Sequence, residues 1–165
     1  GLSNYNGETL EKATAILNEL HVPFVINQNR YSIFDRTIEQ NGLKETAVRL
    51  GKGIIAFSPL AQGLLTDRYL HGIPEDSRIR TDGRFLHADT LTPERLDQIR
   101  ALNELAAARG ESLATMALKW ILKDGAVTNV LVGASRPAKI LDDLKVLEGP
   151  GLTDEELALI DKYSL

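Results

Sequence analysis

Apolar residues recur at helical spacing in several stretches of the chain. The first stretch, residues 7–20, places its apolar side chains on one helix face, with Asn6 as a plausible N-cap. Thr92 followed by Pro93 marks another helix start, and Thr153 with Glu156 forms a capping box. The remaining stretches end at or near glycine, as helices commonly do. The predicted helices therefore cover residues 7–20, 43–50, 93–109, 113–124 and 137–147, and a terminal segment after Thr153.

Short apolar runs between these helices predict buried strands. They comprise residues 24–26, 53–57 and 130–132, and residues 1–3 read as the end of a further strand. Strands that alternate with helices indicate a parallel sheet with right-handed crossovers. A (β/α) barrel needs eight such units in about 250 residues, and this chain supplies four. The pattern therefore predicts an α/β fold that corresponds to half a barrel.

The segment GIIAFSPLAQGLLTDRY, residues 53–69, continues to be apolar beyond the strand that it contains. A plain connection would become polar after Ser58 and Pro59. No periodicity persists from Ser58 to Thr92, and this is far longer than a typical loop. We therefore expect a lid or a binding loop after the third predicted strand.

Composition excludes several classes of function. The 165 residues are 43% hydrophobic with a net charge of −4, which fits one globular domain and argues against a nucleic-acid surface. No run reaches the roughly 18 apolar residues of a membrane span. There is no cysteine, so we expect no disulfide and no thiolate metal site, and a cytoplasmic protein is the simplest interpretation. Because Gly1 stands first, we expect the sequence to be part of a longer chain.

Uncharged amides and hydroxyls follow the predicted strands at the ends where barrel enzymes carry their chemistry. This set suits a neutral ring that bears a carboxamide, for which Phe57 offers a stacking face. Ordinary turn and cap chemistry explains the same residues equally well. Cations on the long loop and a Gly and Ser before a predicted helix start also suggest a site for phosphate groups. These strand-end residues are Ser3, Asn4, the segment 27–30, Ser58 and the segment 133–136, and the cations are Arg68, Arg78, Arg136 and Lys139.

Other kinds of active site lack their motifs. The three histidines, His21, His71 and His87, have no metal-ligand spacing. The chain contains no G-x-S-x-G elbow, no P-loop and no G-x-G-x-x-G turn. Tyr31 and Tyr69 lie near predicted strand ends, but neither has a Lys or His beside it in sequence.

Four segments in this order and spacing resemble the aldo-keto reductases: GLSNYN, INQNRYSIFDR, AFSPLAQGLLTDRYLHGIPEDSR and VLVGASRPAKILDDL. The most similar subgroup contains bacterial L-glyceraldehyde 3-phosphate reductases and voltage-gated potassium channel β-subunits. The resemblance covers essentially all of residues 1–165. It implies that they form the C-terminal, NADP(H)-binding half of a (β/α)8 TIM barrel, roughly strands five to eight, with the long loop after strand seven.

The resemblance also implies roles for individual residues. Ser3, Asn4 and Gln28 would hold the nicotinamide carboxamide, and Phe57 would stack on its ring. Lys139 would contact the 2′-phosphate of NADP(H). The other implied cofactor contacts are Ser58, Pro59, Leu60, Ala61 and Gln62 along the pyrophosphate, Arg68 and Arg78 above it, Gly133 and Ser135 at the adenosine phosphates, and Asp142 and Asp143 at adenine, where the family usually has Glu and Asn.

The family's catalytic Asp, Tyr, Lys and His lie on the first four barrel strands, so we assign no catalytic residue. The resemblance favours an NADPH-dependent aldehyde or ketone reductase, with L-glyceraldehyde 3-phosphate as one candidate substrate and no metal. The alternative is a non-catalytic NADPH-binding partner like the channel β-subunits. A structural half-barrel is a third hypothesis, and its open strand edges would require pairing, for instance in a homo-oligomer.

Overall fold

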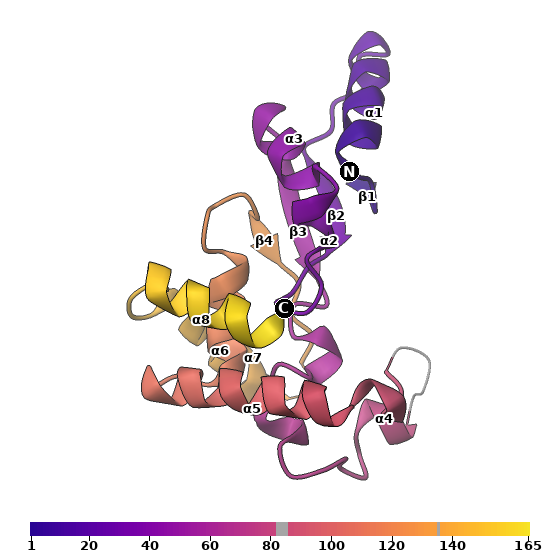
Figure 1. Ribbon diagram of the computed structural model, residues 1–165. Coiled ribbons are helices and arrows are strands. Elements are labelled where there is room, and N and C mark those ends of the chain that lie inside the picture. Colours follow the sequence, from indigo (N-terminus) through magenta and orange to yellow (C-terminus); the bar gives the residue numbers. More distant parts are fainter. Residues whose placement is uncertain (82–85, 135) are drawn as a thin grey trace. The chain divides into compact units, whose positions relative to one another are not determined.

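A computed structural model describes residues 1–81, 86–134 and 136–165 of the chain (Figure 1). Ser135 and Gly83 lie outside these described residues, as does the side chain of Arg78. The chain forms two compact units, which we describe one at a time. The first unit consists of Gly1–Pro59 with Ile121–Gly133, and the second consists of Leu60–Trp120 with Ala134–Leu165.

The first unit is built on a four-stranded parallel sheet, which confirms the predicted α/β alternation. Its strands are ordered β1-β2-β3-β4, and every neighbouring pair is parallel. In the register of the sheet, Ser3 lies beside Gln28, Gln28 beside Ile55, and Arg30 beside Phe57. The strands comprise β1 Leu2–Ser3, β2 Ile26–Arg30, β3 Gly53–Phe57 and β4 Asn129–Val130.

The two faces of this sheet differ in burial. Asn27 and Asn29 of β2 are buried, and so are Ile54 and Ala56 of β3. The alternate residues of both strands remain half-exposed or exposed, Arg30 among them. Since successive side chains of a strand point to opposite faces, one face belongs to the core and the other is largely open.

The prediction of a strand at residues 24–26 is wrong in position. Strand β2 begins only at Ile26 and continues through four polar residues, because its ladder with β3 extends from Gly53 to Phe57. The side-chain amide groups of the polar residues on the buried face donate hydrogen bonds. Asn27 donates its side-chain amide to Asn29, which in turn donates to the carbonyl of Tyr5. Strand β4 likewise is one residue earlier and shorter than the predicted run 130–132.

Two helices of the first unit begin and end close to their predicted bounds, α1 (Gly7–Glu19) and α3 (Leu43–Arg49). The short helix α2 (Thr37–Gln40) was not predicted. The Asn6 side chain accepts from the Thr9 N–H at 2.8 Å, which confirms the predicted N-cap. Leu10 is buried, but Ile16 and Leu20 on the same predicted face are 55% and 65% exposed, so that part of the prediction is wrong.

Short helical turns and longer helices make up the described part of the second unit. Thr92 caps α5 as predicted, by accepting from the Arg95 N–H. Helix α5 packs against α8, and Trp120 of α6 is buried. The elements are η1 (Ala61–Gly63), η2 (Asp67–Tyr69), α4 (Arg78–Thr81), η3 (Ala88–Thr90), α5 (Pro93–Ala108), α6 (Leu113–Ile121), α7 (Pro137–Leu144), η4 (Lys145–Leu147) and α8 (Asp154–Ser164).

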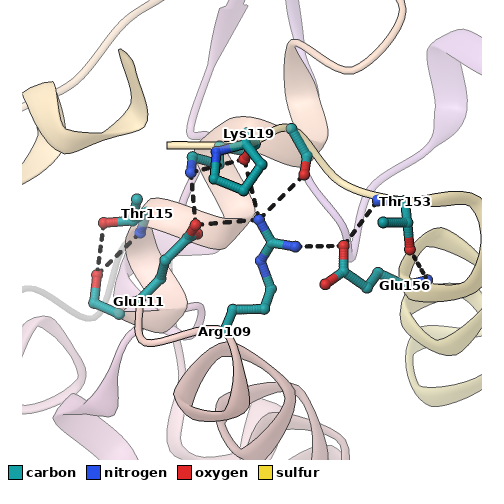
Figure 2. A network of polar contacts seen from close by, with 9 residues as sticks. Arg109, Glu111, Thr115, Lys119, Thr153 and Glu156 are labelled. Carbon is teal, nitrogen blue, oxygen red and sulfur yellow. Dashed lines mark hydrogen bonds and ion pairs between the residues drawn. The ribbon is translucent and has the colours of Figure 1, made fainter. Parts of the chain in front are cut away.

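A buried polar network ties α5, α6 and α8 together, and Figure 2 shows it from close by. We call Arg109, Glu111, Lys119 and Glu156 the Arg109 clamp. The Arg109 guanidinium forms ion pairs with Glu111 and Glu156, and Lys119 Nζ lies 2.6 Å from Glu111 Oε1. Both cations also donate to the carbonyl of Pro150. The side chains of Arg109 and Lys119 are only 7% and 6% exposed, so each charge is compensated where water has little access.

The apolar residues of α7 and of η4, which follows it, are exposed, which contradicts their prediction as inward-facing. Ile140, Leu141, Leu144 and Leu147 are 49%, 65%, 50% and 77% accessible. Helical spacing identifies the side chains that share a face, but it does not show which surface covers that face. Within the described residues of this chain, the face of α7 stays largely uncovered.

Candidate cofactor-binding site

Three predicted site residues converge where β1 ends. The Ser3 hydroxyl donates to the backbone carbonyl of Gln28 at 3.2 Å, and the Asn4 N–H donates to the same oxygen at 2.9 Å. This sharing follows from the parallel register, which sets Ser3 beside Gln28. The structure thus brings together Ser3, Asn4 and Gln28, whose amide and hydroxyl groups can both donate and accept hydrogen bonds.

Phe57 ends β3 on the same face of the sheet as Gln28, because the register aligns Gln28 with Ile55, two residues before Phe57. Its ring is half-exposed and available for stacking. The guanidinium of Arg30 lies 5.8 Å from the centroid of that ring. The family resemblance assigned no role to Arg30. Its contact with Phe57 depends on the pairing of β2 with β3, which no local sequence motif reveals.

Backbone strain coincides with the predicted site. Asn4, Ser58, Ala61 and Gln62 have positive φ angles of 59°, 53°, 47° and 60°. The fifth described non-glycine residue with a positive φ is His21. This conformation costs roughly 1–2 kcal/mol for a residue with a Cβ, and such residues cluster at functional sites. Four of the predicted cofactor contacts are therefore held in conformations that no sequence pattern indicated.

In the second unit, the predicted binding loop folds on its own side chains. Leu64, Leu65 and Tyr69 are buried, so the apolar run after the third strand contributes to a core. The Arg68 guanidinium is 2.8 Å from an Asp76 carboxylate oxygen and also donates to the Asp76 carbonyl at 2.9 Å. Arg68 therefore stabilises this loop.

The other predicted contacts of this stretch are placed as follows. Pro59 is buried at the end of the first unit, Leu60 is half-exposed in the second, and Arg78 is the first residue of α4.

The start of α7 carries the predicted adenosine-phosphate residues of the second unit. Lys139 lies exposed in the first turn of α7. The N-cap residue, Arg136, forms no side-chain capping hydrogen bond. Asp142 forms an ion pair with Lys145 at 2.8 Å. Burial raises the pKa of Asp143, and the neighbouring Asp142 adds to this effect while Lys139 opposes it. Gly133 is exposed in the first unit.

Tyr31 has two lysines nearby in space, although none is adjacent in sequence. Its hydroxyl donates to Glu39 and accepts from Lys123 at 2.9 Å, and Lys44 Nζ lies 3.4 Å away. Burial, with the Glu39 carboxylate, raises the pKa of Tyr31, and burial lowers the pKa of Lys123. Tyr31 is fully buried, and this group joins the end of β2 to the segment before β4.

Two other kinds of site find no support in the described part of the chain. There, no three or more His, Asp or Glu side chains are grouped so that they could hold a metal ion. The helices described also include none that is long and apolar enough to cross a membrane.

Comparisons with known proteins identify the family of this chain. The sequence profile of the aldo/keto reductase family matches residues 1–164. This chain belongs to the aldo/keto reductase family. The match confirms the family that the four segments suggested.

Individual family members cover the chain almost completely. An L-glyceraldehyde 3-phosphate reductase of Escherichia coli is 45% identical over 99% of this chain and 48% of its own length. A Schizosaccharomyces pombe protein named as a voltage-gated potassium channel β-subunit is 33% identical over 98% of this chain and 48% of its length. The chain thus spans about half the length of these relatives.

Solved structures of the family confirm the fold. A glycerol dehydrogenase from Gluconobacter oxydans superposes with a TM-score of 0.77 at 28% identity, over 99% of this chain and 47% of that structure. The chain therefore has the α/β fold of part of an aldo/keto reductase TIM barrel.

Proposed function

We propose that this chain is the NADP(H)-binding half of an oxidoreductase that reduces an aldehyde or ketone to an alcohol, with L-glyceraldehyde 3-phosphate as the candidate substrate. The observation that supports the proposal is that Ser3 and Asn4 both donate to the backbone carbonyl of Gln28, and that Ser3 and Gln28 share their sheet face with Phe57. Neutral donors and acceptors beside an aromatic ring suit a nicotinamide carboxamide.

The chain's residues would bind and orient the cofactor, which supplies a hydride when bound. In the first unit, the Gln28 and Asn4 side chains would bind the carboxamide, and Phe57 would stack on the ring. In the second unit, Lys139 would bind the 2′-phosphate that distinguishes NADPH from NADH. The group that protonates the reduced carbonyl would come from the barrel half that this chain does not match.

Cofactor binding to the 165-residue chain tests the proposal most directly. We expect Lys139→Glu to weaken NADPH binding at least tenfold, since a charge-assisted contact to phosphate is replaced by repulsion. NADH affinity should change little, because NADH lacks the 2′-phosphate. The matched control is Lys162→Glu, which makes the same charge change on an exposed residue of α8. Equal losses for both cofactors, or none, would disprove the role of Lys139.

The relative named as a channel β-subunit supports a second candidate, a partner protein that binds NADPH without turnover. The two candidates differ in catalysis. We expect no oxidation of NADPH by L-glyceraldehyde 3-phosphate with this chain alone. We expect oxidation when the barrel half of the Escherichia coli reductase that this chain does not match is supplied as a separate polypeptide. Absence of turnover in a complex that forms and binds NADPH would favour the second candidate.

A further inference from the structure

Arg30 occupies the last position of β2 on the open face of the sheet. It is exposed, whereas Asn29 just before it is buried on the opposite face. The register aligns Arg30 with Phe57, and Gln28 lies two residues earlier on the same face. The side chain is therefore placed among the residues proposed to hold the nicotinamide.

The charge of Arg30 is not neutralised by the described part of the chain. Arg49, Arg68 and Arg109 each form an ion pair with a carboxylate. Arg30 has no such pair there, and its contact is the ring of Phe57, 5.8 Å from the centroid. A guanidinium near an aromatic face keeps its N–H edge available, and that edge can bind a phosphate or carboxylate through two parallel hydrogen bonds.

The strand residues around Arg30 on this face carry no charge. They are Ser3, Gln28, Ile55, Phe57 and Asn129, which share the face through the register of β1 to β4. The whole chain has a net charge of −4 and therefore does not attract anions in general. Among these strand residues Arg30 is the one cation, and a cation among neutral groups discriminates strongly between a charged and an uncharged ligand.

We propose that Arg30 binds the anionic group of the carbonyl substrate, so that it selects phosphorylated or carboxylated aldehydes over neutral ones. The inference rests on the proposed function, because the substrate carbonyl must meet the nicotinamide beside Phe57. Arg30 is then a residue that determines substrate class, and it is separate from the groups that bind the cofactor.

The test compares ligands that differ only in the phosphate. Glycerol 3-phosphate and glycerol are the unreactive alcohol forms of the two glyceraldehydes, and their affinities for the NADPH-loaded chain are measured by calorimetry or NMR. We expect glycerol 3-phosphate to bind about ten- to a hundredfold more tightly than glycerol. Arg30→Gln should abolish this preference, and Arg30→Lys should retain part of it because the charge remains. Arg49→Gln, an exposed arginine of α3 in the same unit, should leave it unchanged.

Two results would overturn the inference. One is a phosphate preference that survives Arg30→Gln. The other is an Arg30→Gln variant that loses NADPH affinity instead, which would make Arg30 a cofactor contact. A titration with inorganic phosphate, followed at the Arg30 Nε–H resonance without cofactor, separates the two proposals. A chain that fails to bind NADPH refutes the proposed function, whereas an unmoved Arg30 resonance refutes the anion site.

Discussion

The Arg109 clamp of the second unit predicts a measurable stability change for Glu156→Gln. Glu156 accepts the Thr153 N–H at 2.7 Å in a capping box and also forms an ion pair with Arg109 (Figure 2). Glutamine can keep the capping hydrogen bond but cannot compensate the charge of Arg109. The substitution therefore isolates the ion pair from the helix cap.

The expected loss follows from burial. Removing one partner of a buried pair costs about 3–5 kcal/mol, and an exposed pair is worth about 0–1 kcal/mol. Arg109 is 7% exposed and Glu156 is 20% exposed, and Arg109 keeps Glu111 as well as the carbonyls of Pro150 and Gly151. We therefore expect Glu156→Gln to lower the free energy of unfolding by about 2 kcal/mol at neutral pH.

Urea unfolding followed by Trp120 fluorescence measures this loss, since Trp120 is the only tryptophan and is buried in the same unit. Burial raises the pKa of Glu156, but the Thr153 N–H and Arg109 outweigh it, so the pKa lies below its ordinary value. The ion pair therefore stabilises the fold fully above about pH 4.3 and is lost as pH falls through the lowered pKa. The difference between wild type and Glu156→Gln should shrink over that range.

The adjacent exposed residue supplies the control for this prediction. Glu155→Gln removes the same charge from the first turn of α8 and should change the free energy of unfolding by less than about 0.5 kcal/mol. A loss for Glu156→Gln no larger than that of the control, or one that does not depend on pH, would refute the reasoning.

Three further substitutions test other parts of the chain by urea unfolding. Tyr31→Phe should lower the free energy of unfolding by about 1–3 kcal/mol, because Glu39 loses a donor next to a fully buried ring; an unchanged midpoint would contradict this. Gly7→Ala should cost about 1–3 kcal/mol, since a Cβ would lie 2.5 Å from the Gly42 carbonyl oxygen; a stability equal to wild type would show that the contact relaxes freely. Ala61→Gly should instead raise the free energy of unfolding by about 0.5–1 kcal/mol, because its φ of 47° strains a residue with a Cβ; a loss of stability would refute the strain.

The sequence was sufficient for the fold class and for the helix caps, because these depend on local chemistry. Asn6, Thr92 and Thr153 cap helices as predicted. Strand β2 was misplaced because its residues after Ile26 are polar and only the ladder with β3 reveals them as a strand. The exposure of Leu141 could not be predicted either, since helical period does not identify the covering surface.

For the candidate site, the resemblance named Ser3, Asn4 and Gln28, and in the structure Ser3 and Asn4 both donate to the backbone carbonyl of Gln28. Their roles toward a cofactor stay predictions, and Ser135 lies outside the described residues. The sequence placed Arg30 at a strand end but gave it no role, because its relation to Phe57 arises only when two strands pair. Local patterns thus identify candidate binding residues, but which of these residues lie side by side depends on how the strands pair.

The alternation along β2 has a consequence for how this chain tolerates insertions and deletions. A slip of one residue against β3 would move Gln28 and Arg30 to the buried face and expose Asn27 and Asn29. A single misalignment would thus bury a cation without a partner and remove the recognition groups together. Insertions or deletions between α1 and β2 that shift this alignment should therefore destabilise the fold itself, whether or not a ligand is bound.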